Sequence, residues 1–97
     1  MWNNARQRAK VKDIEFSLPM EWVETRLQIG ICETTGLPFD YSFNRLWSPS
    51  IDKINPHGGY TPDNCQMTLF IYNSAKLQGT HEDVVKFARA LIQKHDN

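Results

Sequence analysis

The chain has 97 residues, with 11 Lys or Arg residues, 11 Asp or Glu residues and a formal net charge of zero. This length predicts one domain, residues 1–97, with a small core. A neutral chain is not a generally basic nucleic-acid binder, although one face can still be basic. No apolar run approaches the roughly 20 residues of a membrane span. The N-terminus lacks the apolar core of a signal peptide, so we expect a cytoplasmic protein.

A short exposed helix is predicted at residues 3–12. It has four cations and no acid: Arg6, Arg8, Lys10 and Lys12. Residues 1–12 therefore form either a solvated face or an arm that binds the phosphates of a nucleic acid. Residues 14–18 alternate enough in polarity to form a short extended segment.

A second helix is predicted at residues 19–29. Pro19 suits a first helical turn, the apolar residues that follow recur at helical spacing, and Gly30 is a natural stop. Turn residues come next along the chain. Three aromatic residues of that segment are expected to pack in the core: Phe39, Phe43 and Trp47.

Residues 50–76 are predicted to form a strand, a turn, a return strand and a helix. Residues 50–54 form the first strand, residues 65–70 return, and residues 71–76 turn helical. The last helix, residues 80–94, begins at Thr80, which forms a Thr-x-x-acid cap with Asp83. It carries one apolar stripe: Val84, Val85, Ala88, Leu91 and Ile92. The expected fold class is α+β.

A hairpin packed on the following helix can bring two oxygen ligands to one point. Asp52 lies in the middle of the first strand, and Asn73 lies near the start of the helix. A carboxylate and an amide oxygen suit Mg²⁺ or Mn²⁺, which stabilise the charge on a cleaved phosphodiester. Each residue also has a purely structural interpretation. Asp52 would pair with Lys53 or Arg45, and Asn73 would cap the helix.

Four motifs in this order resemble the HNH nucleases, the His-Me finger or ββα-metal group, and more narrowly small phage-encoded HNH-like proteins. The motifs are CETTG (32–36), SIDKI (50–54), GYTPDN (59–64) and NSAK (73–76). The resemblance spans residues 8–93. It implies a ββα-metal core with N-terminal helices and a C-terminal helix. It also implies a metal-dependent endonuclease that acts on DNA. Such a protein would be encoded by a phage or a mobile element and would act in the cytoplasm, for a phage protein that of the infected bacterial cell.

The resemblance assigns roles to individual residues. It makes Asp52 and Asn73 metal ligands, and it makes Asn64 the residue that pins the loop through backbone hydrogen bonds. Asn64 alone would be read as a turn residue. Lys53 stands where the family has the His that activates water. The general base of the pattern is therefore missing from this chain.

Lys53 is a poor replacement for that base. A His titrates near pH ~6.5, whereas a Lys at ~10.4 is protonated at neutral pH. The adjacent carboxylate and an anionic substrate both favour the charged ammonium. We therefore expect Lys53 to contact the phosphate. The base would be metal-bound water or His57 from the turn, or hydrolysis is lost and the scaffold only binds nucleic acid or a host protein.

Three further residue types have open interpretations. Lys76 lies one helical turn from Asn73, where it can reach a phosphate or simply be a surface lysine. The two cysteines, Cys32 and Cys65, exclude a four-thiolate zinc site. A zinc held by both cysteines with His57 or His81 is the alternative to two buried, apolar thiols. Two tyrosines, Tyr60 and Tyr72, are expected to be packing residues, with base stacking as the alternative.

Overall fold

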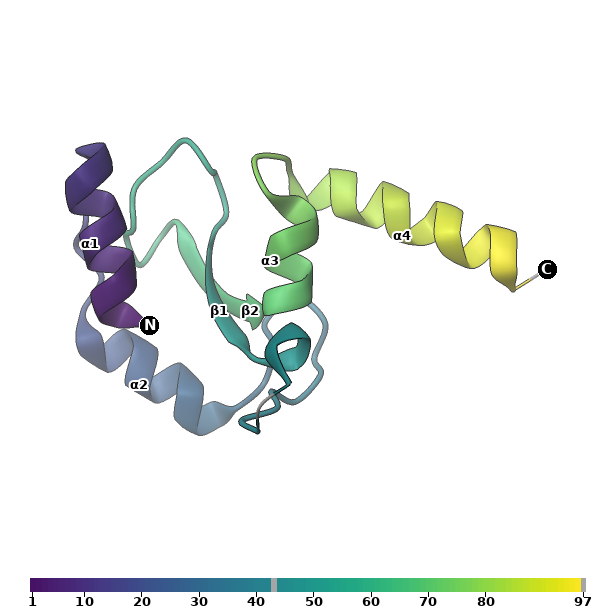
Figure 1. The fold of residues 1–97 in the computed structure, drawn as a ribbon, viewed down its shortest axis with the longest axis horizontal. Helices are drawn as coiled ribbons and strands as arrows, with labels where there is room; N and C mark the ends of the chain where they lie inside the picture. The colour runs from purple at the N-terminus through teal and green to yellow at the C-terminus, as the bar shows by residue number, and fades with distance from the viewer. Residues whose placement is uncertain (43, 97) are drawn as a thin grey trace.

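The computed structural model describes residues 1–42 and 44–96. Within them, a two-stranded antiparallel sheet packs among four α-helices and one 3-10 turn, which is the predicted α+β class (Figure 1). The elements are α1 (Trp2–Lys12), α2 (Met20–Ile29), η1 (Arg45–Trp47), β1 (Pro49–Lys53), β2 (Cys65–Leu69), α3 (Phe70–Lys76) and α4 (His81–His95). In the described part of the chain, no helix combines the length and apolar character needed to cross a membrane.

The two N-terminal helices form where the sequence predicts them. Helix α1 turns Ala5 and Ala9 toward the body, and both are buried. Helix α2 follows Pro19 and ends at Gly30, which has a left-handed φ of 74°. Gly30 donates its N–H to the carbonyl of Arg26 at 2.9 Å. A glycine is favoured there because it adopts positive φ without a steric penalty.

The hairpin divides its side chains between two faces because strand residues alternate. Ile51 on β1 lies opposite Met67 on β2, and both are buried in the core cluster. Asp52 lies opposite Gln66 and turns toward α3. The hairpin therefore presents an apolar face to the core and a polar face to α3.

A short backbone contact ties the N-terminal segment to the hairpin loop. Phe16 and Tyr60 form an isolated bridge, in which the N–H of Ser17 donates to the carbonyl of Tyr60 at 2.9 Å. The N–H of Tyr60 donates in turn to the carbonyl of Glu15 at 2.9 Å. The extended segment predicted at residues 14–18 thus places α1 next to the loop of the hairpin.

The core lies between the sheet and the N-terminal helices. Twelve buried residues form it: Ala5, Ala9, Leu18, Trp22, Val23, Cys32, Phe39, Ile51, Tyr60, Cys65, Met67 and Leu69. Phe39 and Tyr60 are buried as expected, and Tyr72 is buried on α3. The expectation for Trp47 is wrong, because η1 lies at the surface and leaves Trp47 40% exposed. Phe43 lies outside the described residues.

The C-terminal helix departs from the expectation that it would close the fold. Thr80 and Asp83 form the predicted capping box, so the start of α4 is confirmed. However, no residue of α4 is buried, and the helix projects away from the body (Figure 1). Its apolar stripe therefore remains largely outside the core.

The packing of the core predicts that two methionines differ strongly in their contribution to the free energy of unfolding. Met67 is fully buried, whereas Met20 is 45% exposed. We expect Met67→Ala to lower the free energy of unfolding by about 2–5 kcal/mol, because it leaves a cavity in the sheet–helix interface. The matched change Met20→Ala should cost less than about 1 kcal/mol. Urea unfolding followed by tryptophan fluorescence measures both, and equal losses would contradict this core.

Candidate functional site

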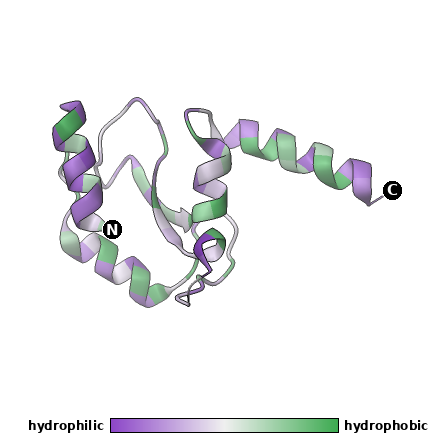
Figure 2. Ribbon diagram, viewed as in Figure 1, coloured by the Kyte–Doolittle hydropathy of each residue, from purple (hydrophilic) through white to green (hydrophobic). Residues whose placement is uncertain are grey.

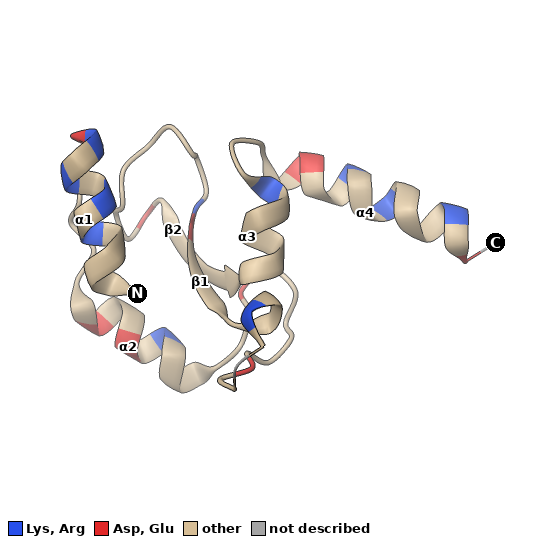
Figure 3. Cartoon of the chain, in the orientation of Figure 1, with Lys and Arg blue, Asp and Glu red and all other residues tan. Residues whose placement is uncertain are grey.

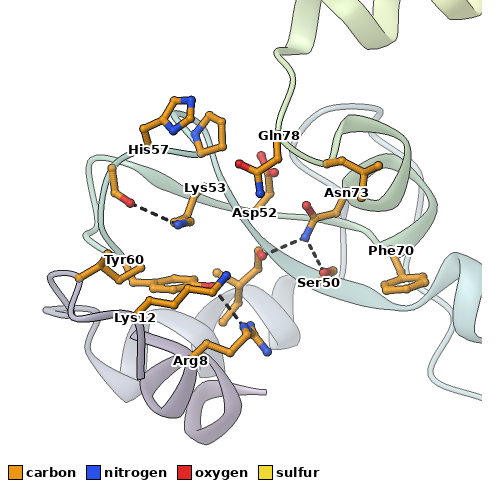
Figure 4. Close-up of a pocket in the computed structure, with 15 residues that line it drawn as sticks. Arg8, Lys12, Ser50, Asp52, Lys53, His57, Tyr60, Phe70, Asn73 and Gln78 are labelled. Carbon is orange, nitrogen blue, oxygen red and sulfur yellow. Dashed lines mark hydrogen bonds between the residues drawn. The ribbon is translucent and has the colours of Figure 1, made fainter. Parts of the chain in front are cut away.

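A cavity of about 510 Å³ opens between α1, the hairpin loop and α3. The Phe16–Tyr60 bridge makes this cavity possible, since it holds the N-terminal segment beside the loop. Figure 4 shows residues from all three segments facing the same space. The residues that line the cavity are Arg8, Lys12, Ile14, Ser50, Ile51, Asp52, Lys53, Pro56, His57, Gly58, Tyr60, Phe70, Asn73, Leu77 and Gln78.

Three permanent cations line this cavity, and Tyr60 supports two of them. Arg8 donates from Nε to the hydroxyl of Tyr60 at 3.3 Å. Lys53 has its ammonium 5.1 Å from the centre of the Tyr60 ring and donates to the carbonyl of Gly58 at 3.3 Å. The face of an aromatic ring attracts cations. Tyr60 therefore draws Arg8 and Lys53 toward one wall of the cavity.

The four cations of α1 separate into two pairs. Arg8 and Lys12 are four residues apart and share the helix face that lines the cavity. Arg6 and Lys10 lie outside the cavity lining, and Arg6 places its guanidinium 5.6 Å from the centre of the Trp2 ring. Figure 3 shows the basic residues gathered on α1. The predicted basic arm is thus a helix with only one of its basic pairs at the cavity.

The carboxylate of Asp52 forms a buried ion pair with Lys76. The Lys76 ammonium donates to both carboxylate oxygens at 3.0 Å. It also donates to the carbonyls of Lys53 at 2.6 Å and Ile54 at 3.1 Å. The two side chains are nearly inaccessible, since Asp52 is 2% exposed and Lys76 is 4% exposed. Lys76 is therefore neither a surface lysine nor placed to contact a phosphate in this arrangement.

The remaining contacts of Asp52 also lie within the fold. Gln66, its partner across the hairpin, donates from Nε2 to Oδ2 at 2.9 Å. The two residues that the sequence offered as partners of Asp52, Lys53 and Arg45, make other contacts. Lys53 contacts the hairpin loop, and Arg45 places its guanidinium 4.4 Å from the centre of the Phe70 ring. The ion pair therefore joins β1 to α3 instead of pairing neighbours at a sheet edge.

Asn73 reaches the same strand from the middle of α3. It donates from Nδ2 to the hydroxyl of Ser50 at 2.9 Å and to the carbonyl of Ile51 at 3.1 Å. Leu69 is the N-cap of α3, so Asn73 is not the helix cap. Its amide holds α3 against β1, on the same polar face of the hairpin as Asp52.

These donors do not fit a divalent cation as they are arranged. The described residues contain no group of three or more His, Cys, Asp or Glu side chains that could hold a metal. Both oxygens of Asp52 already accept hydrogen bonds from the Lys76 ammonium. This positive charge therefore occupies the side of the carboxylate that a metal ion would bind. A second cation there would meet like-charge repulsion. The ligand roles of Asp52 and Asn73 remain predictions.

Asn64 holds the hairpin loop from both sides. Its Oδ1 accepts from the N–H of Asn55 at 2.9 Å, and its Nδ2 donates to the carbonyls of Asn55 at 3.1 Å and Gly59 at 2.9 Å. Backbone hydrogen bonds of this kind are those that the family resemblance implies for Asn64. His57 lies exposed on the same loop and lines the cavity. A base role for His57 remains a prediction.

The two cysteines are both free and buried. Cys32 accepts from the N–H of Leu69 at 3.3 Å, so it contributes a contact to the core. Burial raises the pKa of the Cys65 thiol to about 11, which keeps it protonated near neutral pH. His81 is engaged elsewhere, with its Nδ1 2.9 Å from the Tyr72 hydroxyl. In this arrangement the thiols are small apolar side chains.

Sequence reasoning missed the residues that support the charged ones. Gln66 could have been found from the hairpin register, which places it opposite Asp52. Tyr60 was expected only to pack, yet its ring and hydroxyl contact Lys53 and Arg8. No local pattern signals the contact with Arg8, because it joins residues 52 positions apart in the sequence.

The ion pair predicts an asymmetric response to substitution. Lys76→Met should lower the free energy of unfolding by about 3–5 kcal/mol, because it leaves the Asp52 carboxylate buried without a counter-charge. The double variant Asp52→Leu/Lys76→Met should recover most of this loss, since no unpaired charge remains. Urea unfolding measures each variant, with Lys86→Met on exposed α4 as the matched control. A loss for Lys76→Met no larger than for Lys86→Met would contradict the buried pair.

Comparison with known proteins supports the fold. No family model matches the sequence, and no curated protein matches it. Among solved structures, the chain is similar to PacI, described as a rare-cutting HNH restriction endonuclease that perturbs DNA. The TM-score is 0.62 at 16% sequence identity, and the match covers 96% of this chain and 75% of PacI. The chain therefore has an HNH-endonuclease-like fold.

Proposed function

We propose that this chain is a DNA-binding domain built on an HNH-endonuclease-like fold, and that phosphodiester hydrolysis has been lost from it. The observation that carries the proposal is the Asp52–Lys76 pair, in which an ammonium takes up both oxygens of the expected metal ligand. This is the binding alternative that Lys53 already suggested in the sequence. The HNH-like fold supports DNA as the ligand.

The charge of the cavity supports a phosphate ligand. Arg8, Lys12 and Lys53 line it, and its one carboxylate, Asp52, is already neutralised by Lys76. The cavity therefore presents a net positive charge on a chain whose total formal charge is zero. Lysine and arginine contacts to backbone phosphates provide affinity that is independent of base sequence and sensitive to salt.

The three cations differ in how freely they can move. Arg8 and Lys53 are each held by Tyr60. Lys12 is exposed and has no hydrogen-bond or ion-pair partner among the described residues. Cations that are held in place before binding fix the position of a bound phosphate, whereas a flexible cation contributes only its charge. We propose that Arg8 and Lys53 define the phosphate position and that Lys12 adds a second contact.

A second candidate is a metal-dependent HNH-like endonuclease. It is favoured because Asp52 and Asn73 line the same cavity, and because Asn73 binds Ser50 and Ile51 through its nitrogen, which leaves its oxygen for a metal. This candidate requires Lys76 to release the carboxylate of Asp52 for Mg²⁺ or Mn²⁺. It also requires a base other than Lys53, for which His57 is the loop candidate.

The first functional prediction concerns DNA affinity. Fluorescence anisotropy with a labelled duplex should show binding that weakens with salt. Arg8→Ala/Lys12→Ala should weaken binding, and should reduce the slope of log K against log salt by about 2, because two phosphate contacts are lost. The matched control is Arg6→Ala/Lys10→Ala, which removes the same charges from the same helix but outside the cavity.

The control decides whether the cavity is the site. Equal losses in the two double variants would show that only the net charge of α1 matters, and would contradict the cavity. Circular dichroism of both variants checks that α1 remains folded. Wild-type protein that does not change the anisotropy of the labelled duplex at low salt would also overturn the proposal.

The second functional prediction concerns cleavage. Wild-type protein should not nick supercoiled plasmid with Mg²⁺ or Mn²⁺, because Asp52 is occupied by Lys76. Nicking by the wild type that disappears in Asn73→Ala and in Asp52→Ala would establish the nuclease instead. Since both changes remove contacts between β1 and α3, circular dichroism must show that each variant is folded.

A further inference from the structure

We propose that the cavity receives one unpaired nucleotide, so that single-stranded DNA binds through a base as well as through its phosphates. This ligand class rests on the proposed DNA binding and states which form of DNA the cavity fits. The phosphate binds at the wall that carries Arg8 and Lys53, and the base binds at the wall that carries Phe70 and Asn73. A volume of about 510 Å³ lies within the range of pockets that enclose a small organic ligand.

The two walls of the cavity differ in charge. Among the described residues, the permanent cations that line it come from α1 and from the end of β1. The lining residues of α3 and of the segment after it carry no charge: Phe70, Asn73, Leu77 and Gln78. Figure 4 shows Arg8 and Lys12 on one side of the cavity and Asn73 and Phe70 on the other. A ligand that fills the cavity therefore needs one anionic end and one uncharged end, as a nucleotide has. The hydropathy of the same segments, with a polar α1 and a more apolar start of α3, can be followed in Figure 2.

Asn73 provides an oriented hydrogen-bond acceptor at the uncharged wall. Its Nδ2 donates to the hydroxyl of Ser50 at 2.9 Å and to the carbonyl of Ile51 at 3.1 Å. A carbonyl only accepts, so these contacts determine which side of the amide carries the nitrogen. No described residue donates to Oδ1. This oxygen repels phosphate oxygens, but it can accept from the N–H groups that the bases of DNA carry.

Phe70 provides a ring for stacking at the same wall. Its side chain is half-buried and lines the cavity. Arg45 places its guanidinium 4.4 Å from the centre of the ring but does not itself line the cavity, so the ring is held from outside. An aromatic ring stacks on the face of any base, whereas it gives a phosphate no favourable contact. The uncharged wall therefore suits a base.

The position of Asn73 favours an unpaired base. Side chains that recognise bases in a duplex project from the protein into a groove. Asn73 instead lies in the wall of a cavity and is tied to β1 by two hydrogen bonds. A base reaches it only after leaving its stack and its partner, and the cost of this step is smallest for DNA that is already single-stranded. A duplex therefore binds through its phosphates alone.

Fluorescence anisotropy with three labelled strands of about eight nucleotides tests the contribution of the base. A thymidine strand should bind at least about fivefold more tightly than an abasic strand, which has the same phosphates but no base to stack. A strand of N3-methylthymidine lacks the N–H donor of thymine and should bind at least about threefold less tightly than the thymidine strand. A paired duplex of the same length should also bind less tightly at about 0.15 M salt, where exposed charges are screened.

The strands separate failure of this inference from failure of the proposed DNA binding. Equal affinities for the thymidine and abasic strands would overturn the bound base and leave phosphate binding intact. Equal affinities for the thymidine and N3-methylthymidine strands would overturn the hydrogen bond to Asn73, and a duplex that binds more tightly than the thymidine strand would overturn the unpaired ligand. Absence of binding to every strand and to the duplex would overturn the proposed DNA binding itself.

A pair of matched variants tests the uncharged wall. Phe70→Leu should lower the ratio of thymidine-strand to abasic-strand affinity at least about threefold, because the ring is lost while an apolar side chain remains. The control Phe87→Leu makes the same change on α4, where the side chain is 62% exposed and lies outside the cavity lining, and should leave the ratio within about twofold. Circular dichroism checks that both variants are folded. Equal ratios in the two variants would overturn the role of Phe70.

Discussion

The buried ion pair between Asp52 and Lys76 is the constraint on which the hairpin–helix unit depends. The Lys76 ammonium binds both oxygens of a β1 carboxylate and two β1-end carbonyls, so one side chain of α3 holds the strand at four points. Two charges this deeply buried are tolerated only when their hydrogen bonds are satisfied. They are satisfied here, and the position of α3 against the sheet is consequently well defined.

The same pair determines the character of the cavity. With the Asp52 charge neutralised internally, the cations that line the cavity face no competing carboxylate among its lining residues. Tyr60 then organises two of these cations through its ring and hydroxyl. A chain with no net charge thereby acquires a local positive site, which is how a neutral domain can bind a polyanion.

The fold and the chemistry of the site need not agree. The chain has an HNH-endonuclease-like fold, but the Lys76 ammonium engages the carboxylate of Asp52. The resemblance in the sequence implies, in addition, that Lys53 stands where the family has its His. Function depends on the groups at the site and not on the fold that carries them. The structure shows the contact of Lys76 with Asp52, whereas the role of Lys53 at the position of the base remains what the sequence resemblance implies.

The sequence by itself indicated the four α-helices and the two strands of the described residues, because their signals are local, but it did not indicate η1. Pro19 and Gly30 bound α2, Thr80 and Asp83 start α4, and alternation marks the two strands. Only the tertiary structure decided which side chains contact one another. The sequence placed Lys76 on the same helix face as Asn73, but only packing shows that its ammonium is buried against Asp52. Likewise an apolar stripe on α4 predicts a buried helix face, yet only the fold shows that Leu91 and Ile92 of this stripe remain exposed, because burial depends on contacts between distant segments.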